Sequence, residues 1–240
     1  MPTTVRSFAK INIGLCIGER RSDSFHELRT LYQTIGMHDR VTVTVGAGAG
    51  IELCCAAPGV PLDDTNTCWR IVEKAMALLG ASGRVRIEIE KRLPVRGGVG
   101  GASSNAVASL LALQRELQRE LAPADRFRLA AEVGSDLPVF LIGGTVLGVG
   151  RGEEVYPLPE LPPMPCVLTT PGIAISTPKA FLDWDHMQSE AKLTAGAGSR
   201  ALGRTVFARG RGTAAGGVSV QPPCRTPRGL PRTPAGRAGG

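Results

Sequence analysis

The chain has 240 residues, with 28 basic and 21 acidic side chains, a formal net charge of +7 and 42% hydrophobic residues. This length allows one large domain or two small ones, and the hydrophobic fraction is sufficient for a buried core. The sequence has no apolar run long enough for a transmembrane helix, and residues 1–12 lack the pattern of a secretion signal. We therefore expect a cytoplasmic protein.

The positive charge is concentrated at the C-terminal end, where eight arginines fall within residues 200–240. Without them, 20 basic residues remain against 21 acidic ones, so the rest of the chain is close to neutral. The segment 200–240 has no sustained hydrophobic period, and we expect it to be disordered. Its composition also suits an out-of-frame reading of GC-rich DNA. Because its arginines lack interleaved aromatic residues, no nucleic-acid partner is expected.

The cysteines and histidines do not indicate a metal centre. There are six cysteines and three histidines, and no two cysteines have the spacing of a Cys-x-x-Cys pair. We expect reduced thiols, most of them buried, and no metal site built from protein side chains.

The N-terminal quarter is predicted to be rich in β-strands. Alternating apolar residues predict strands, separated by the polar turn 19–27 and a glycine–alanine turn at 46–50. The predicted strands cover residues 6–16, 31–35, 40–45 and 51–55. A helix then follows the capping residues 64–67 and ends near Gly80.

The following segments alternate between strands and helices. After strand 85–89 come a glycine-rich loop, a helix that starts at Ser103 or Ser104, and a second helix at 124–133. Residues 145–149 and 154–158 predict a hairpin, 167–170 and 173–176 are strand-like, and 178–186 predict a helix. The fold class is α+β, and the irregular order differs from regular Rossmann alternation.

The loop is contained in RGGVGGASSNA, residues 96–106. Glycines allow close approach of the backbone, and the start of a helix offers N–H groups and a positive dipole end to a phosphate. The loop lacks the Gly-Lys-Ser/Thr of a Walker A motif. A plain glycine turn that only caps a helix remains the alternative.

Polar residues elsewhere are further site candidates. Lys10 and Asn12 lie two residues apart on one predicted strand and so share a face, although Lys10 alone could face solvent. Asp136 follows a helix end and is alternatively an N-cap of a short helix. Phe25 and His26 lie in a polar loop, where the aromatic ring either stacks on a base or covers the adjacent strand.

Three segments, residues 7–43, 91–113 and 134–158, together resemble the 4-diphosphocytidyl-2-C-methyl-D-erythritol kinases. That family belongs to the superfamily of galactokinase, homoserine kinase, mevalonate kinase and phosphomevalonate kinase (GHMP kinases). The resemblance implies an N-terminal GHMP-kinase domain, ribosomal protein S5 domain 2-like, over 1–160. Residues 161–199 would then begin an incomplete C-terminal domain.

The resemblance also implies an activity, namely ATP-dependent phosphorylation of the 2-hydroxyl of the cytidine diphosphate substrate, with Mg²⁺. Lys10 and Asp136 match the catalytic residues, since a carboxylate at the acceptor hydroxyl and a nearby ammonium suit phosphoryl transfer. The residues that match the ATP site are Pro94, Gly97, Gly98, Val99, Gly100, Gly101, Ala102, Ser103, Ser104 and Asn66. The residues that match the substrate site are Asn12, Phe25, His26 and Thr177. A monomer or homodimer without a membrane partner is expected.

The sequence departs from this family at three places. Phe25 replaces a tyrosine, Ser24 replaces a glycine of the same turn, and the third glycine-rich motif near the C-terminus is not recognisable. That motif helps to close the phosphate site in the family. The alternative function is therefore an inactive nucleotide-binding remnant of the kinase.

Overall fold

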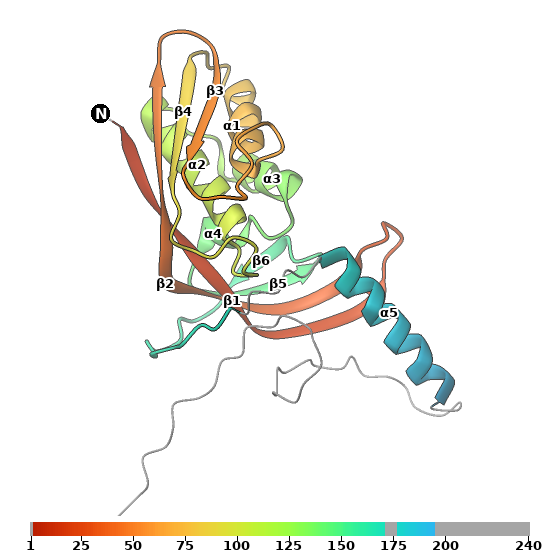
Figure 1. The fold of residues 1–240 in the computed structure, drawn as a ribbon. Coiled ribbons are helices and arrows are strands. Elements are labelled where there is room, and N and C mark those ends of the chain that lie inside the picture. The colour runs from red at the N-terminus through yellow and green to blue at the C-terminus, as the bar shows by residue number, and fades with distance from the viewer. Residues whose placement is uncertain (1, 171–176, 195–240) are drawn as a thin grey trace, which may run out of the picture.

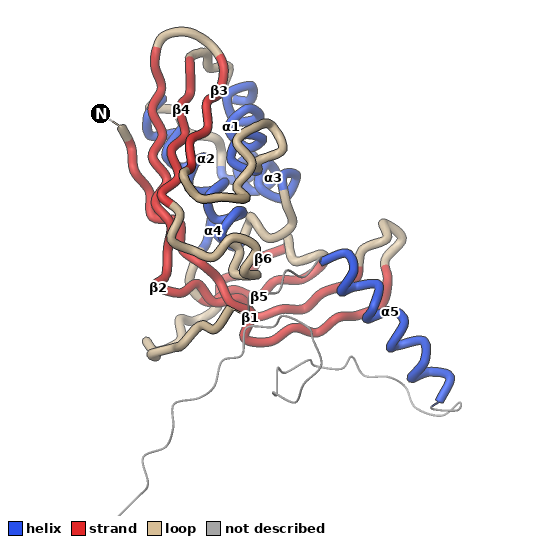
Figure 2. Tube along the Cα trace, viewed as in Figure 1, coloured by secondary structure: helices blue, strands red, loops and turns tan. Residues whose placement is uncertain are grey.

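The computed structural model describes residues 2–170 and 177–194, except for the side chains of 177–178 and 188–194. It forms a six-stranded sheet with helices packed on one side of its upper part (Figures 1 and 2). The strands are β1 (Thr3–Arg20), β2 (His26–Gly46), β3 (Gly50–Cys55), β4 (Arg84–Glu90), β5 (Thr145–Gly150) and β6 (Glu154–Pro157). The helices are α1 (Thr67–Leu78), α2 (Gly101–Leu117), α3 (Pro123–Val133), α4 (Val139–Ile142) and α5 (Thr177–Thr194).

The long strand β2 organises the sheet. Strand β1 pairs with β2 along one edge, while residues 40–46 and 28–33 of β2 pair antiparallel with β4 and β5 respectively. Strand β3 is parallel to β4, and the crossover between them contains α1. The sheet order is therefore β3-β4-β2-β5-β6, with β1 beside β2. A single strand thus connects the two ends of the sheet.

The sequence predicted two strands where β2 is continuous. Phe8 lies opposite His38, but the next residue, Ala9, lies opposite Ile35, so that residues 36 and 37 form a bulge in β2. A bulge interrupts the alternation of apolar and polar residues and bends the strand. The apparent gap in the pattern is this bulge, and the β1–β2 pair curves through it (Figure 1).

The main hydrophobic core lies between the upper half of the sheet and helices α1, α2 and α3. In β4 the burial alternates strictly along RVRIEIE, as a strand with one buried face requires. The fully buried side chains include Val41, Val43, Val85 and Ile87 from the sheet and Ile71, Val72, Leu110, Leu113 and Leu129 from the helices. Burial of each such side chain contributes about 1.5–3 kcal/mol, so this core fixes the elements that carry the loop.

Several predictions need correction. Helix α2 begins at Gly101, two or three residues before the predicted start, because Gly100 in left-handed backbone (φ +72°) is its N-cap. Residues 167–170, which have a strand-like pattern, form neither a helix nor a strand among the described residues. Among the cysteines in the described part of the chain, only Cys68 is buried, so the expectation of mostly buried thiols is wrong there. The expectations for 173–176 and for the tail 200–240 lie outside the described residues.

The fold class and the other predicted helices and strands agree with the structure. The fold is α+β; α1 ends before Gly80 at φ +55°, α3 covers the second predicted helix, and β5 and β6 form the predicted hairpin. Helix α5 covers the predicted helix at 178–186 and extends beyond it. Among the helices that the structure describes, none combines the length and apolar character needed to cross a bilayer.

Candidate functional site

The glycine loop connects β4 to the start of α2. The N-cap of α2 is Gly100, which has no side chain that could pair with the N–H groups of the first turn. Arg96, Gly98 and Gly100 all adopt positive φ angles between 60° and 72°. The loop leads directly into the start of α2, where the first N–H groups and the positive end of the helix dipole lie. That place suits an anion such as a phosphate group.

The loop packs closely on β1 at one point and is open at another. The backbone N–H of Lys10 donates to the carbonyl of Val99 at 2.9 Å. A Cβ added to Gly100 would lie 2.7 Å from Cζ of Phe140 and 3.0 Å from Cγ of Lys10. A Cβ at Gly98 would meet no atom within 4 Å. Gly100 therefore allows close packing, whereas Gly98 borders open space.

Lys10 is held by polar neighbours on the β1–β2 pair. Its Nζ donates to Oδ1 of Asn12 at 2.7 Å, as their shared face predicted, and Nδ2 of Asn12 donates to Oγ1 of Thr30 at 2.6 Å. The ammonium also lies 5.4 Å from the ring centre of Tyr32. Burial lowers the pKa of Lys10, and the negative charge of Asp136 partly opposes this shift. Lys10 therefore does not simply face solvent, which was the alternative from the sequence.

Asp136 lies in the turn between α3 and α4. Its Oδ1 accepts a hydrogen bond from Oγ of Ser103 in the first turn of α2, at 2.7 Å. The N-cap of α4 is Pro138, and no side-chain capping hydrogen bond is formed there. Asp136 is therefore not the cap of that helix. Burial raises the pKa of Tyr32, and the Asp136 charge, which also acts on Lys10, raises it further. The two predicted catalytic residues therefore share one electrostatic environment beside α2.

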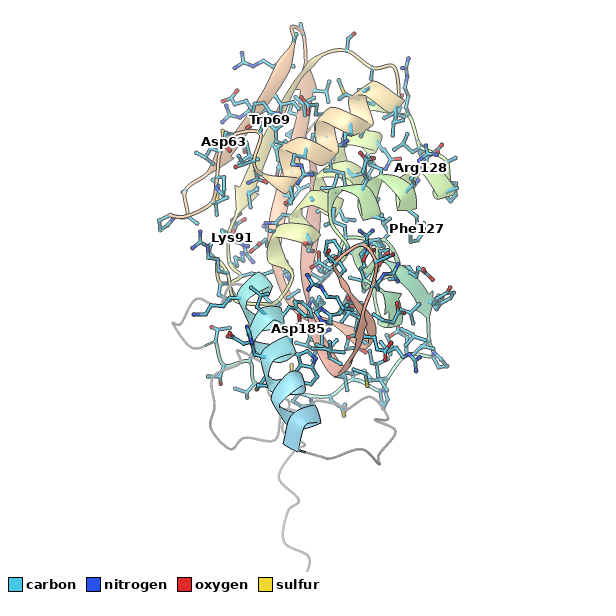
Figure 3. All side chains as sticks on the ribbon, turned by 90° about the vertical axis from the view of Figure 1, so that its right-hand side faces the viewer. Asp63, Trp69, Lys91, Phe127, Arg128 and Asp185 are labelled. Carbon is cyan, nitrogen blue, oxygen red and sulfur yellow. The ribbon has the colours of Figure 1, made fainter. Side chains whose placement is uncertain are left out.

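The tip of the β1–β2 hairpin forms a second group. Phe25 is 53% exposed, and the Arg151 guanidinium lies 5.1 Å from its ring centre. His26 was predicted to lie in a loop, but it is the buried first residue of β2. Its Nε2 lies 2.7 Å from Oδ1 of Asp185, and its ring stacks on Phe181 at 5.1 Å. Asp185 lies on α5 and is labelled there in Figure 3.

Ser24, which replaces a glycine of the resembling family, adopts φ +69°. The turn therefore keeps a left-handed residue at this position, although serine has a Cβ that disfavours this region by about 1–2 kcal/mol. The substitution leaves Phe25 and His26 at the end of the same hairpin. The backbone N–H of Phe25 donates to Oδ1 of Asp23 at 3.1 Å and helps to hold the turn.

The other predicted residues lie in different environments. Asn66 is the N-cap of α1: its Oδ1 accepts from the N–H of Cys68, and its Nδ2 donates to the carbonyl of Pro61. Thr67 donates to the carbonyl of Ala102 at 3.1 Å, so the beginnings of α1 and α2 adjoin. The other predicted residues of the ATP site lie in the loop or in the first turn of α2, namely Pro94, Gly97, Gly101 and Ser104. The Ser104 hydroxyl is buried beside Ser7. The side chain of Thr177 lies outside the described part of the chain.

The sequence did not reveal several neighbours of the site. Thr30 and Tyr32 come from β2, and Arg151, Phe181 and Asp185 come from distant segments. Tyr32 lies opposite Asn12 in the pairing of β1 with β2, so knowledge of the register would have identified it. The sequence of one strand does not give that register. Over the described residues, no group of three or more His, Cys, Asp or Glu side chains is arranged to hold a metal ion.

Comparisons with known proteins show which family the chain resembles. Residues 66–144 match the N-terminal domain of GHMP kinases. The 4-diphosphocytidyl-2-C-methyl-D-erythritol kinase of Saccharopolyspora erythraea is 37% identical over 80% of the chain and 61% of its own length. That of Moorella thermoacetica is 36% identical over 83% of the chain and 69% of its own length.

The solved structures give the same result for the fold. A crystal structure of 4-(cytidine 5'-diphospho)-2C-methyl-D-erythritol kinase superposes with a TM-score of 0.65 at 35% identity, covering 75% of this chain and 63% of that one. A homoserine kinase from Cytophaga hutchinsonii, 19% identical with a TM-score of 0.53, covers 79% of this chain and 67% of its own and has a similar fold. The chain spans about three fifths of the length of several of the curated relatives.

Proposed function

The chain belongs to the 4-diphosphocytidyl-2-C-methyl-D-erythritol kinase family, and from this we propose that it transfers the γ-phosphate of ATP to the 2-hydroxyl of 4-diphosphocytidyl-2-C-methyl-D-erythritol. The observation that carries the proposal is the grouping of two polar pairs, Lys10 with Asn12 and Ser103 with Asp136, beside a helix start that no side chain caps. This grouping combines a carboxylate, an ammonium and an anion site, as phosphoryl transfer to an alcohol requires.

Asp136 is proposed to orient the acceptor hydroxyl and accept its proton. The hydrogen bond from Ser103 fixes the direction of the carboxylate, which leaves its other oxygen for the hydroxyl. Lys10 would stabilise the developing negative charge on the acceptor oxygen. Asn12 fixes the position of Nζ through the 2.7 Å hydrogen bond. The depression of the Lys10 pKa by burial is the electrostatic cost of placing an ammonium there.

The glycine loop is proposed to hold the ATP phosphates through backbone N–H groups. Of the predicted range 97–104, the N–H groups of Gly97 and Ser104 already donate to the carbonyls of Pro94 and Gly100. Residues 98–103 would therefore provide the groups without a loop lysine, because the α2 dipole and the N–H groups themselves favour negative charge. Asn66 is proposed to lie near the adenine, since α1 begins beside Ala102 in the loop-to-helix junction. Its amide also caps α1 and so fixes that junction.

The residues present fit Mg²⁺ bound together with ATP. Mg²⁺ prefers oxygen ligands and is usually held by one or two carboxylates, waters and substrate phosphates. The Ser103 hydroxyl lies in the first turn of α2, where it would contact a water molecule of the ion, while Asp136 remains at the acceptor hydroxyl. The ion would neutralise the phosphate charge when bound.

The hairpin tip is proposed to recognise the cytosine. Phe25 offers an exposed aromatic face for stacking, and His26 offers a ring whose Nε2 faces Asp185, which leaves Nδ1 for another partner. Phenylalanine keeps the stacking surface of the tyrosine that it replaces but lacks the hydroxyl. Thr177, at the beginning of α5, is proposed to contact the same substrate.

The organisation of the chain is part of the proposal. Residues 1–160 would form the kinase domain, 161–199 the beginning of a second domain, and 200–240 a tail without a role in the site. We propose the cytoplasm as the compartment and a monomer or homodimer as the assembly.

A coupled assay of ADP release tests the activity. We expect turnover with ATP, Mg²⁺ and the cytidine diphosphate substrate, and a loss of about 10²-fold or more in Asp136→Asn, because the acceptor hydroxyl then lacks its base. Asp125→Asn is the matched control, since Asp125 lies on α3 and pairs with Arg128 at the surface. Equal rates for wild type and Asp136→Asn would remove Asp136 from this role.

Isothermal titration calorimetry decides between the kinase and a non-catalytic remnant. Binding of ATP and of the cytidine substrate, without turnover in the coupled assay, would support the remnant. If neither ligand binds, both functions are overturned.

A further inference from the structure

Asp39 carries a fully buried carboxylate outside the Lys10–Asp136 group. Its side chain is 0% exposed, and its Oδ1 accepts from the backbone N–H groups of Arg92 and Leu93, each at 2.7 Å. Its Oδ2 accepts from Nζ of Lys91, whose side chain is only 8% exposed. A buried charge is stable only when it is paired and hydrogen-bonded, as here. All three donors lie in the three residues that lead from β4 into the glycine loop.

Ser7 makes equivalent contacts at the other end of the loop. Its buried hydroxyl lies 2.8 Å from Oγ of Ser104 and 2.6 Å from Oδ1 of Asn105, and it donates to the latter because an amide oxygen only accepts. Both partners lie in the first two turns of α2, directly after the loop. Ser7 and Asp39 are themselves opposite residues in the pairing of β1 with β2.

The contacts between these two ends support the same arrangement. Leu93 and Val99 from the loop segment are buried together with Ala9 of β1. A Cβ added to Gly101 would lie 2.9 Å from Nζ of Lys91, so the Lys91 ammonium adjoins the first residue of α2. Figure 3 shows Lys91 after the end of β4, beside the beginning of α2. The loop thus has a fixed entrance and exit, while Gly98 borders open space.

We propose that the cross-strand pair Ser7–Asp39 sets the position of the ATP-phosphate loop by holding its two ends, without contact with the nucleotide. The proposal rests on the proposed function for the identity of the ligand. In this arrangement Lys91 is committed to Asp39, and Asp39 and Ser7 are positioning residues. Asp39 fixes the entrance at 91–93 and Ser7 fixes the exit at 104–105, so the N–H groups between them keep their spacing.

Hydrogen exchange of the ligand-free full chain tests the positioning directly. We expect amides of residues 94–101 to exchange about ten-fold faster in Asp39→Asn, because the neutral amide of this variant pairs only weakly with the Lys91 ammonium. Ser7→Ala removes a hydroxyl without leaving a buried charge and is expected to act in the same direction. Glu52→Gln is the matched control, since Glu52 pairs with Arg84 and Arg86 at the other end of the sheet.

Steady-state kinetics adds a readout that general destabilisation does not move. The KM for ATP is expected to rise about ten-fold in both variants, with the KM for the cytidine substrate within about two-fold, because small displacements of positioning groups are costly. Equal acceleration of exchange in 94–101 and in the core strand β4 would overturn the proposal, as would unchanged exchange in both variants. Faster exchange confined to the loop in a chain without turnover would support the positioning and reject the kinase activity.

Discussion

At the scale of single residues, two glycines of the loop have similar backbones and different surroundings. Gly98 and Gly100 have φ angles of +69° and +72°, so both lie in the region that side chains with a Cβ rarely adopt. Gly98 has free space around its missing side chain, whereas Gly100 is in contact with Phe140 and Lys10. The two positions therefore separate the cost of backbone strain from the cost of packing.

Alanine substitutions should show this difference in the free energy of unfolding. We expect Gly98→Ala to lose about 1 kcal/mol from the left-handed backbone alone. Gly100→Ala should lose at least about 2 kcal/mol, because its Cβ would also displace Phe140 and the Lys10 side chain. Urea denaturation of both variants measures the two values. Equal losses would contradict the close packing of Gly100.

At the scale of elements, the two helices that begin beside the loop are capped differently. Asn66 closes the start of α1 with its side chain, whereas Gly100 leaves the start of α2 to other partners. In the capped helix the side chain of Asn66 already pairs with an N–H group of the first turn, whereas the uncapped helix presents its N–H groups to the proposed phosphates. This difference assigns separate tasks to two neighbouring helix ends.

The cap of α1 can be tested on its own. We expect Asn66→Ala to lower the free energy of unfolding by about 1 kcal/mol, because the N–H of Cys68 loses its acceptor. Asn66→Asp keeps this acceptor and should lose clearly less. Thermal unfolding followed by circular dichroism compares the two variants with wild type. A loss in Asn66→Asp as large as that in Asn66→Ala would show that the donor to Pro61 matters more than the cap.

The elements also show what the sequence could reveal. Helices with clear caps and strands with strict alternation, such as α1 and β4, were predicted within a few residues because local chemistry sets them. The continuity of β2 was missed, since the bulge at 36–37 hides the alternation. Lys10, Asn12 and Asp136 were found as candidates, but their partners Thr30 and Ser103 depend on the register and on the packing of α2. Contacts between distant segments leave no periodic signal in one sequence.

At the scale of the whole molecule, charge is distributed unevenly. The eight arginines of 200–240 account for the excess of positive charge, and the rest of the chain is nearly balanced. In the described part, many charged side chains form surface pairs such as those of Glu52 with Arg84 and Arg86. The proposed domain organisation therefore assigns long-range electrostatic attraction to the tail and the chemistry to residues 1–160.

Removal of residues 200–240 tests this division. The full chain should bind a cation exchanger at pH 7 and elute with salt, whereas the chain 1–199, with a net charge near −1, should not be retained. The unfolding temperature should change by no more than about 1 °C, because the tail is proposed not to pack on the domain. A clear decrease in that temperature would contradict the proposed boundary.

Strand β2 also sets the distance between the sites of the two proposed substrates. His26, at the proposed cytosine site, and Asp39, which holds the entrance of the phosphate loop, are thirteen residues apart on this one strand. At roughly 3.3 Å per residue an unbent strand would separate them by about 40 Å, and the bulge shortens that distance. The distance between the proposed cytosine site and the phosphate loop would then depend on the length of β2 between His26 and Asp39 and on the bend at the bulge. Inserting a residue between these two positions would change that distance, although no residue proposed to contact either substrate would be replaced.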